Sequence, residues 1–552
     1  MSTGSVYQKP DVIVHNGRIH TVDAHDTIAQ AIAVRRGRIW AVGDDSTILA
    51  LAGDATEVID AKGRSVIPGV IDSHNHAWEA GRFFAGLITF GISSLDELKK
   101  KLRRKVAPLP PGTWLQGGGW IESQFREGRM PTRWDLDEAA PDHPVVLERI
   151  FSTCVANSRA LALAGITAKT PDPPQGEIDR HPDTGEPTGL LHRAAKMLVR
   201  QAMPGPFGSS SFGQAPGAEE SIVRALDEYL RWGITSIVEP GVTPALCRAY
   251  QNLYAQGKLT LRVNLMPNWH GFAVKQEREH MDRLIEEMGF YTGFGDHWLR
   301  LGALKMAIDG GLTSRSAYKS WPYVDEERAR SDVPLRLDMD ELDGLVEKAH
   351  ANGWSVGIHV VGDLSQERAV KAIHRAFQMH GGERRHQIIH GYYPTKASLR
   401  LMKEANIIAA VQPAFIYGEA DGYPWLLSLA KQREFLPLRS YHASGIVVAL
   451  STDMPSAHFN PFWGMYAAVT RKGMRGHQLG SEEAVPWPLA LRMMTLHGAY
   501  LTGEEHDKGS LEVGKLADLA LLDRDLVQIT PEAIRHLTVL MTMVNGRILY
   551  QA

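Results

Sequence analysis

The chain has 552 residues, of which 44% are hydrophobic and 22% charged, and its formal net charge is −3. This near balance, without long runs of one sign, argues against nucleic acid or an anionic membrane as a partner. Two cysteines are too few for a disulfide framework. Because no stretch resembles a signal peptide or a membrane span, we expect a soluble, cytoplasmic protein.

The two ends of the chain are predicted to form short β-hairpins. Asn16-Gly17 lies between two alternating segments in DVIVHNGRIHTV, and IAVRRGRIWAVG has the same pattern. Near the other end, ADLALLDRDL and TMVNGRILY are similar, and the NGRI at residue 16 recurs at Asn545. We predict one discontinuous β-sandwich from residues 1–66 and 505–552, with chance repetition of four residues as the alternative.

Between these ends, residues 67–504 alternate short apolar segments with helical stretches, a pattern typical of parallel β/α units. Eight segments are candidate strands: VIPGVIDSH near residue 70, ITSIVEPG at 234, LRVNLMP at 261, LRLGALKMAIDGG at 299, WSVGIHVVGD at 354, HQIIHG at 386, NIIAAVQP at 406 and GIVVALSTDMP at 445. Eight units predict an α/β fold, a closed TIM-like (β/α)8 barrel with its chemistry at the carboxyl ends of the strands.

One connection is too long for a single β/α unit, since roughly 160 residues separate the first two candidate strands. We predict a module inserted after the first strand, over about residues 105–215, beside the mouth of the barrel. Its last part, the Gly-rich and Pro-rich PGPFGSSSFGQAPGAEE, is predicted to be a linker.

Polar side chains stand at several predicted strand ends. In VIPGVIDSHNH, His74 and His76 point the same way along an extended strand, so both imidazoles can reach one ion. Lys305 lies inside an apolar run, where an unpaired ammonium is costly. It either extends its charged end to the strand terminus or is neutral enough to form a carbamate.

Matching residues end the later strands. His359 and His390 end the fifth and sixth strands, although a lone histidine is more often structural, and Asp453 ends the eighth, where it could instead cap a helix. The predicted metal ligands are His74, His76, Lys305, His359, His390 and Asp453. Such nitrogen and oxygen ligands favour one or two zinc ions, with manganese, iron or cobalt as alternatives, and would activate a water near neutral pH.

The ordered elements PGVIDSHNH, LKMAIDGG, IHVVGD, HGYY, STDMP and HDKGSLEVGKLADLALLDRD resemble the amidohydrolase superfamily over nearly the whole chain. Within it, the chain is similar to the branch of N-substituted formamide deformylases, with D-aminoacylases as more distant relatives. The resemblance implies a barrel with a terminal β-sandwich, histidine ligands and an N6-carboxylysine at Lys305 that bridges two metals. It also implies that Asp453 takes a proton from the attacking water. The branch usually carries Glu where this chain has Ile389, which leaves the substrate open.

The predicted function is hydrolysis of a carbon–nitrogen bond in an amide or N-substituted formamide of small size. Asp453 is the predicted catalytic residue and moves the proton to the leaving amine. Ring-deaminating relatives usually carry Glu three residues after the fifth-strand histidine, where this chain has Gly362. A cyclic imide, an ester or a carbon–halogen bond as the target stays open, and so does an inactive scaffold.

Aromatic residues follow several predicted strands and also occur in the insert. If they face the barrel mouth, the substrate carries an aromatic or apolar group, whereas ordinary packing is the alternative. The predicted substrate contacts are Trp120, Arg315, Trp321, Tyr323, Phe415 and Trp463. The sequence leaves open whether the chain forms a homo-oligomer.

Overall fold

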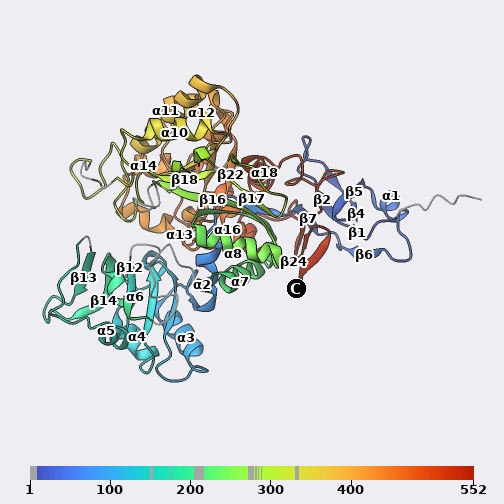
Figure 1. Cartoon of the computed structure of the whole chain (residues 1–552). Helices are drawn as coiled ribbons and strands as arrows, with labels where there is room; N and C mark the ends of the chain where they lie inside the picture. Colours follow the sequence, from blue (N-terminus) through green and yellow to red (C-terminus); the bar gives the residue numbers. More distant parts are fainter. Residues whose placement is uncertain are drawn as a thin grey trace, which may run out of the picture.

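The computed structural model describes residues 9–149, 153–174, 176–203, 217–270, 279, 282–283, 285–287, 289–329, 333 and 335–552. Figure 1 shows a barrel with two outlying parts, the terminal strands on its right and the inserted module at its lower left. In the described part of the chain, no helix combines the length and the apolar character that crossing a membrane requires.

Eight parallel strands form the barrel. In spatial order they are β8 (Val70–Asp72), β15 (Ile234–Val242), β16 (Arg262–His270), β18 (Leu304–Ala307), β19 (Val356–Val360), β20 (Gln387–His390), β21 (Ile408–Val411) and β22 (Val448–Leu450), with β17 (Leu299–Leu301) beside β16. Each strand overlaps one of the eight predicted segments, and β16 runs three residues past the end of its segment. Nearly every described strand residue is buried, as expected where helices cover the outside and side chains fill the inside. The prediction of a (β/α)8 barrel is confirmed.

Hydrogen bonds between the first and last strands, which we call the closing seam, complete the circle. The path of paired strands ends at β8 and β22. The Asp72 carboxylate accepts hydrogen bonds from the Thr452 backbone N–H at 2.9 Å and from the Thr452 hydroxyl at 2.6 Å. Just beyond the strands, the Asp453 N–H donates to the His74 carbonyl at 2.8 Å. The seam therefore brings the two ends of the barrel sequence into register.

Helices surround the barrel (Figure 1), and several of them follow its last strand in the sequence. They are α2 (Ala77–Ala85), α7 (Ala218–Leu230), α8 (Pro244–Ala255), α10 (Leu342–Ala351), α11 (Asp363–His380), α12 (Lys396–Glu404), α13 (Ala414–Glu419), η3 (Ala420–Trp425), α14 (Leu429–Glu434), α15 (Leu438–Ala443), α16 (Pro461–Thr470), η4 (Ser481–Glu483), α17 (Trp487–Met493) and α18 (Leu496–Thr502). Local signals set several starts. Before α8, the Thr243 side chain accepts from the Leu246 N–H, and Pro244 occupies the first turn, where its missing N–H costs nothing.

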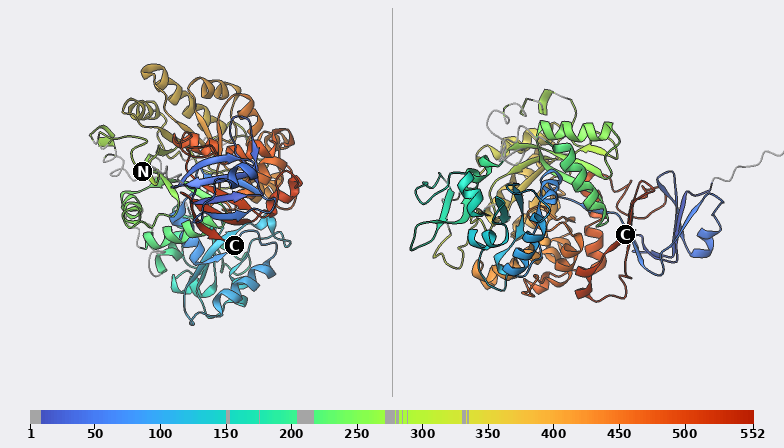
Figure 2. Two further views of the ribbon diagram at one scale, coloured as in Figure 1. Left: turned by 90° about the vertical axis from the view of Figure 1, so that its right-hand side faces the viewer. Right: turned by 90° about the horizontal axis from the view of Figure 1, so that it is seen from below.

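The two termini build a β-sandwich together (Figure 2). One sheet holds β5 (Arg38–Gly43), β4 (Ala31–Arg35), β1 (Val12–His15) and β6 (Glu57–Asp60); the other holds β25 (Arg547–Gln551), β24 (Val539–Val544), β23 (Leu519–Leu522), β7 (Ser65–Pro68), β2 (Arg18–His20) and β3 (Ile28–Ala29), with α1 (Asp45–Leu49) and η5 (Pro531–His536) in the connections. β7 pairs antiparallel with β23, which joins the two ends of the chain. A shared core that includes Val14, Ile19, Leu519 and Met543 fills the space between the sheets.

One predicted hairpin is wrong. β1 and β2 do not pair with each other across Asn16; β1 pairs with β4 and β6, whereas β2 pairs with β3 and β7. The Asn16 backbone N–H donates to Asp45 at 2.8 Å, and the Asn16 side-chain amide donates to Asp60 at 2.7 Å. These two hydrogen bonds hold the turn in which the chain passes from one sheet to the other. The second NGRI segment does form a hairpin, with Asn545 and Gly546 at φ of 53° and 74°.

The inserted module has a six-stranded sheet and its own apolar cores. Its elements are β9 (Leu87–Ile88), α3 (Leu95–Val106), β10 (Leu115–Trp120), η1 (Glu122–Gln124), α4 (Arg133–Ala139), β11 (Val145–Arg149), β12 (Thr153–Ala156), α5 (Ser158–Leu163), β13 (Gly176–Arg180), β14 (Pro187–Arg193) and α6 (Lys196–Ala202). Residues 204–216 of the predicted linker lie outside the described residues. The residue boundaries of the three parts stay a prediction.

Two buried histidines, His350 and His386, lie near the amino ends of β19 and β20. The Val356 N–H donates to His386 Nδ1 at 3.0 Å, so the hydrogen of the neutral His386 ring is on Nε2, which lies 2.9 Å from His350 Nδ1. The His350 Nε2 atom in turn lies 2.7 Å from the Gly381 carbonyl oxygen. Burial lowers the pKa of His386 to about 3, so this chain of hydrogen bonds contains neutral rings.

We expect acid to destabilise the fold through this pair. The unfolded chain binds a proton on His386 below its ordinary pKa of 6.5, whereas the folded chain does so only near pH 3. The stabilising effect is therefore complete above pH 6.5 and is lost as the pH falls, by about 2 kcal/mol at pH 5. Urea unfolding at pH 7 and pH 5 measures this loss. A His386→Asn variant, which can still accept from Val356, should lose less stability over the same pH step; equal losses would contradict the assignment.

Candidate metal centre

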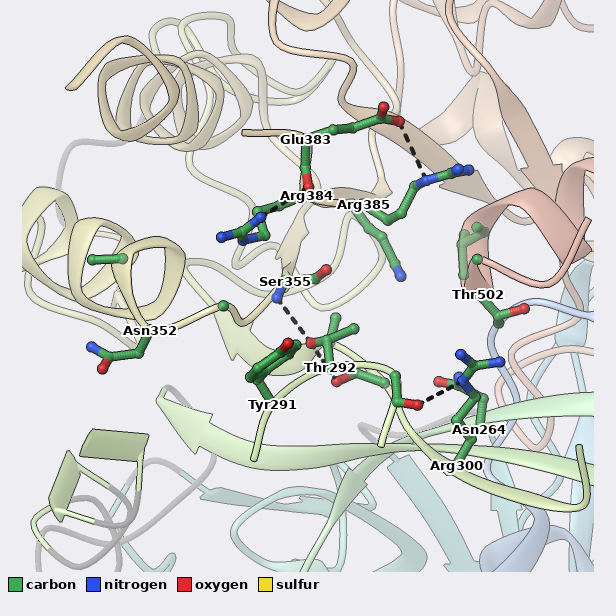
Figure 3. Close-up of a pocket in the computed structure, with 18 residues that line it drawn as sticks. Asn264, Tyr291, Thr292, Arg300, Asn352, Ser355, Glu383, Arg384, Arg385 and Thr502 are labelled. Atoms are coloured by element: carbon green, nitrogen blue, oxygen red, sulfur yellow. Dashed lines mark hydrogen bonds and ion pairs between the residues drawn. The ribbon is translucent and has the colours of Figure 1, made fainter. Parts of the chain in front are cut away.

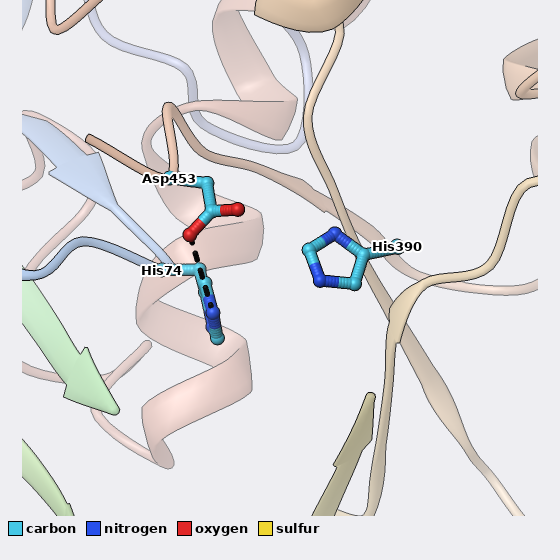
Figure 4. Close-up of side chains that lie close together, drawn as sticks. All are labelled: His74, His390 and Asp453. Atoms are coloured by element: carbon cyan, nitrogen blue, oxygen red, sulfur yellow. Dashed lines mark ion pairs between the residues drawn. The ribbon is translucent and has the colours of Figure 1, made fainter. Parts of the chain in front are cut away.

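The side chains predicted as metal ligands come together at the carboxyl end of the barrel. His74 Nε2 and His76 Nε2 lie 3.6 Å and 3.3 Å from Asp453 Oδ1. Lys305 Nζ is 3.4 Å from His74 Nε2. Candidate ligand atoms of His74, His390 and Asp453 all lie within 4.8 Å of one another, and Figure 4 shows these side chains facing a common point. The closing seam holds the first-strand histidines beside the eighth-strand aspartate.

The fifth and sixth strands complete the group. His390 Nε2 lies 2.8 Å from His359 Nδ1. On its other side, His390 Nδ1 is 2.7 Å from Gln412 Oε1, while the Gln412 amide nitrogen donates to Ala410 and Ser451. Because that nitrogen is the donor end, Oε1 accepts from His390 Nδ1–H. His390 Nε2 therefore carries a lone pair that points toward the centre, the orientation that a metal ligand needs.

Two of these residues have an unusual backbone conformation. His390 and Asp453 have φ angles of 71° and 58°, in the left-handed region that non-glycine residues rarely adopt. Such conformations cost about 1–3 kcal/mol each and persist where neighbouring contacts hold them. Here Gln412 holds the His390 ring, and the closing seam holds the Asp453 backbone. At these two positions the unusual backbone conformation sets the direction of a candidate ligand side chain.

Burial controls the charges of the group. It lowers the pKa of His74 and His359 far below the ordinary range and that of His390 to about 4, so these rings are neutral near pH 7. Burial also lowers the pKa of Lys305 to about 7. For His76, burial acts in the same direction, but the neighbouring carboxylate outweighs it and the pKa is raised. Three of the four imidazoles therefore offer lone pairs, whereas His76 holds a proton more readily.

This donor set fits a divalent cation. His74 Nδ1 and Asp453 Oδ1 are buried atoms without a hydrogen-bond partner among the described residues. Imidazole and carboxylate ligands suit zinc, and their number is sufficient for one or two ions. A divalent cation would add to the compensation that His76 and Lys305 give the buried Asp453 carboxylate.

A cavity of about 440 Å³ opens onto the group. Its walls include the aromatic and apolar residues Trp78, Leu246, Leu312, Tyr392, Phe415 and Tyr423, together with the charged residues Glu79, Glu239, Arg336 and Glu419. Our sequence-based site did not include Glu239 or Glu419. Glu239 could have been found by the signal that identified Asp453, because it is a carboxylate at the end of an apolar strand.

Glu239 links the second strand to the helix after the first. Its Oε2 accepts hydrogen bonds from the Ala77 N–H at 2.6 Å and from the Tyr250 hydroxyl at 2.9 Å. Burial raises its pKa to about 7. Since Ala77 directly follows His76, this bond fixes the turn that positions that imidazole, and Glu239 also lines the cavity.

Among the six predicted substrate contacts, only Phe415 lines this cavity. Trp120 is fully buried inside the insert, where its indole N–H donates to the Leu147 carbonyl at 3.3 Å. Trp463 packs on His458 with ring centroids 3.9 Å apart. Both indoles therefore serve packing, which corrects our expectation for them.

Arg315, Trp321 and Tyr323 form a separate packed group. Arg315 makes a bidentate ion pair with Asp325, with contacts of 2.9 Å and 2.6 Å. Trp321 and Tyr323 are buried, and the Lys319 ammonium lies 4.6 Å and 3.7 Å from their ring centroids. These cation–π and ion-pair contacts shape a loop, and the three residues are absent from the cavity wall.

A second cavity, of about 570 Å³, lies at the opposite end of the barrel (Figure 3). Ser355 and Gln387 in its wall stand at the amino ends of β19 and β20. Arg385 in the same wall pairs with Glu383 at 3.4 Å. In TIM barrels the amino ends of the strands serve stability, whereas catalysis uses the carboxyl ends. The cavity that adjoins the candidate ligands is thus the candidate active site.

The sequence profile described as "Amidohydrolase family" matches residues 57–550. The chain belongs to the amidohydrolase family. It is therefore a hydrolase of carbon–nitrogen bonds other than peptide bonds, as the sequence predicts.

The relatives and solved structures named here match more than nine-tenths of this amidohydrolase. It is 31% identical to an N-substituted formamide deformylase from Arthrobacter pascens over 99% of both chains. Its fold resembles an uncharacterized metal-dependent hydrolase from Pyrococcus horikoshii, with a TM-score of 0.69 and 25% identity over 94% of this chain and 99% of that one. A similar hydrolase from Pyrococcus furiosus gives 0.66 and 26% identity over 92% and 97%.

We expect Gln412→Leu to weaken zinc binding by about 10- to 100-fold, because His390 Nδ1 loses the partner that fixes its tautomer. Competition with a chelating dye measures the affinity. Gln432→Leu is a matched control, since Gln432 is also buried and its Oε1 lies 2.8 Å from His477 Nε2, outside the centre. Unchanged affinity in folded Gln412→Leu protein would refute this role of Gln412.

Proposed function

We propose that this amidohydrolase is a metal-dependent hydrolase of the amide bond in N-substituted formamides or related amides. One observation carries the proposal: six nitrogen and oxygen side chains from five strand ends meet in a buried group at the floor of a cavity. The Arthrobacter pascens deformylase, similar over the full length, supports the bond type. The Pyrococcus hydrolases support the use of a metal.

The residues that would hold the metal are His74, His76, Lys305, His359, His390 and Asp453. A bound divalent ion, for which we propose zinc, would act as a Lewis acid and lower the pKa of a water molecule. Lys305 has a pKa near 7, so an appreciable part of its amine is neutral at neutral pH. The neutral amine can take up carbon dioxide as N6-carboxylysine, which replaces a cation by an anionic ligand.

Asp453 is the proposed proton carrier. Its Oδ1 lies 3.3 Å and 3.6 Å from the first-strand imidazole nitrogens, and its backbone is held by the closing seam. At Oδ1 it would accept the proton of the attacking water and later deliver it to the leaving nitrogen.

Asp453→Asn and His74→Ala separate the two roles. We expect Asp453→Asn to keep bound zinc but to lose about 10²- to 10⁴-fold in kcat, because an amide cannot accept the proton. His74→Ala should lose zinc as well as turnover. Zinc content by mass spectrometry and amine release measure the two effects. Near-native turnover by Asp453→Asn would show that another group moves the proton.

A substrate screen tests the function itself. Zinc-loaded protein should release amine from at least one of three sets, namely N-substituted formamides, N-acyl amino acids and aryl amides, and we expect the formamides to react fastest. Chelation should abolish the activity, and added zinc should restore it. The proposal fails if no set is hydrolysed or if turnover survives complete removal of the metal.

A further inference from the structure

Helix α13 presents two cavity-lining side chains, Phe415 and Glu419, spaced four residues apart. Positions i and i+4 lie on the same face of a helix, about 6 Å apart along its axis. The Phe415 ring centroid is 6.4 Å from that of His390, so Phe415 stands next to the candidate metal centre. Glu419 lies one helical turn from Phe415. One cavity wall therefore carries candidate metal ligands, an aromatic ring and a carboxylate.

A second aromatic ring continues the same wall. The Tyr392 ring centroid is 5.9 Å from that of His390 and 6.4 Å from that of Phe415. Tyr423, which also lines the cavity, places its hydroxyl beside Glu419. A flat ring bound next to the centre can therefore contact Tyr392 and Phe415, and groups on its far side reach toward Glu419.

The charge of Glu419 is weakly compensated. Its side chain is buried, with 7% of its surface exposed, and its Oε2 accepts from the neutral Tyr423 hydroxyl at 3.1 Å. Among the described residues, no cation comes within ion-pair distance of it. Burial raises the pKa of Glu419, and the more distant Arg149 guanidinium opposes that rise. Glu122 already binds Arg149 through two contacts of 2.6 Å and 2.9 Å. A positively charged group in the cavity would therefore gain from Glu419.

The inserted module holds this part of the wall in place. The Gln124 side-chain amide of η1 donates to the Gly418 carbonyl at 2.9 Å. In the same region, Arg475 donates to the Ser123 carbonyl at 3.0 Å. The backbone next to Glu419 is thus held by the insert, and the Tyr423 hydroxyl contacts the carboxylate itself. A preorganised group of this kind costs little entropy when it binds a partner.

We propose that Glu419 is a specificity residue that binds a cationic group of the substrate. The inference rests on the proposed function and narrows its substrate class: the amide carries an aromatic ring, and the ring carries an ammonium or amidinium group on the side away from the scissile bond. Tyr392 and Phe415 contact the ring, and Glu419 pairs with the cation.

Two matched compounds test the inference by binding alone. N-[4-(aminomethyl)benzyl]formamide and N-(4-ethylbenzyl)formamide have nearly the same shape but differ in charge. Calorimetry on zinc-loaded Asp453→Asn protein, in which turnover is slow, should give at least tenfold tighter binding of the aminomethyl compound. Adding Glu419→Gln should reduce the preference to less than twofold. Adding Glu434→Gln, an exposed carboxylate of α14, should leave it unchanged.

Turnover by the wild type provides a second readout. Glu419→Gln should raise KM for the aminomethyl compound about tenfold, while kcat for both compounds stays within a factor of two. Equal binding of the two compounds, or a preference that survives Glu419→Gln, overturns the inference even if formamides are hydrolysed. A preference that depends on Glu419 supports it, even if the wild type hydrolyses neither compound and the proposed function fails.

Discussion

The closing seam at Asp72 is the interaction on which both the barrel and its chemistry depend. It joins the first strand to the last across 380 positions of sequence. The Asp72 carboxylate is buried, and besides Thr452 it accepts a hydrogen bond from the Asn75 amide at 2.8 Å. One side chain thereby anchors the loop that carries the first-strand histidines and the segment that carries Asp453. Backbone hydrogen bonds from Asp453 to His74 and from His76 to Met454 join the same two segments.

A second buried carboxylate, that of Asp309, anchors a loop beside another candidate ligand. Asp309 follows the fourth strand and accepts from the backbone N–H groups of Val361 and Gly362 at 3.0 Å and 2.9 Å and from the Ser365 hydroxyl at 2.7 Å. It thus fixes the loop just after His359. Burial raises the pKa of Asp309 to about 6, and these donors oppose that rise. Outer residues of this kind let a strained, buried ligand group keep one geometry.

The chemistry of the centre and the choice of substrate lie in different parts of the molecule. The candidate ligands stand on strand ends, which parallel pairing places rigidly, whereas the cavity walls come from the connections after the strands. Helix α13 illustrates the division, because it follows the seventh strand and is held by the insert. Insertions and loops can therefore change the substrate while the metal chemistry stays constant.

The sequence by itself determined the eight barrel strands and the six converging side chains, because buried parallel strands are local apolar runs and polar residues at their ends stand out. Only the tertiary structure decided that β1 and β2 belong to different sheets, that Trp120 packs inside the insert, and that Glu419 lines the cavity. The physical reason is range: periodicity reports which face of one segment is buried, whereas a shared cavity depends on contacts between segments far apart in the chain.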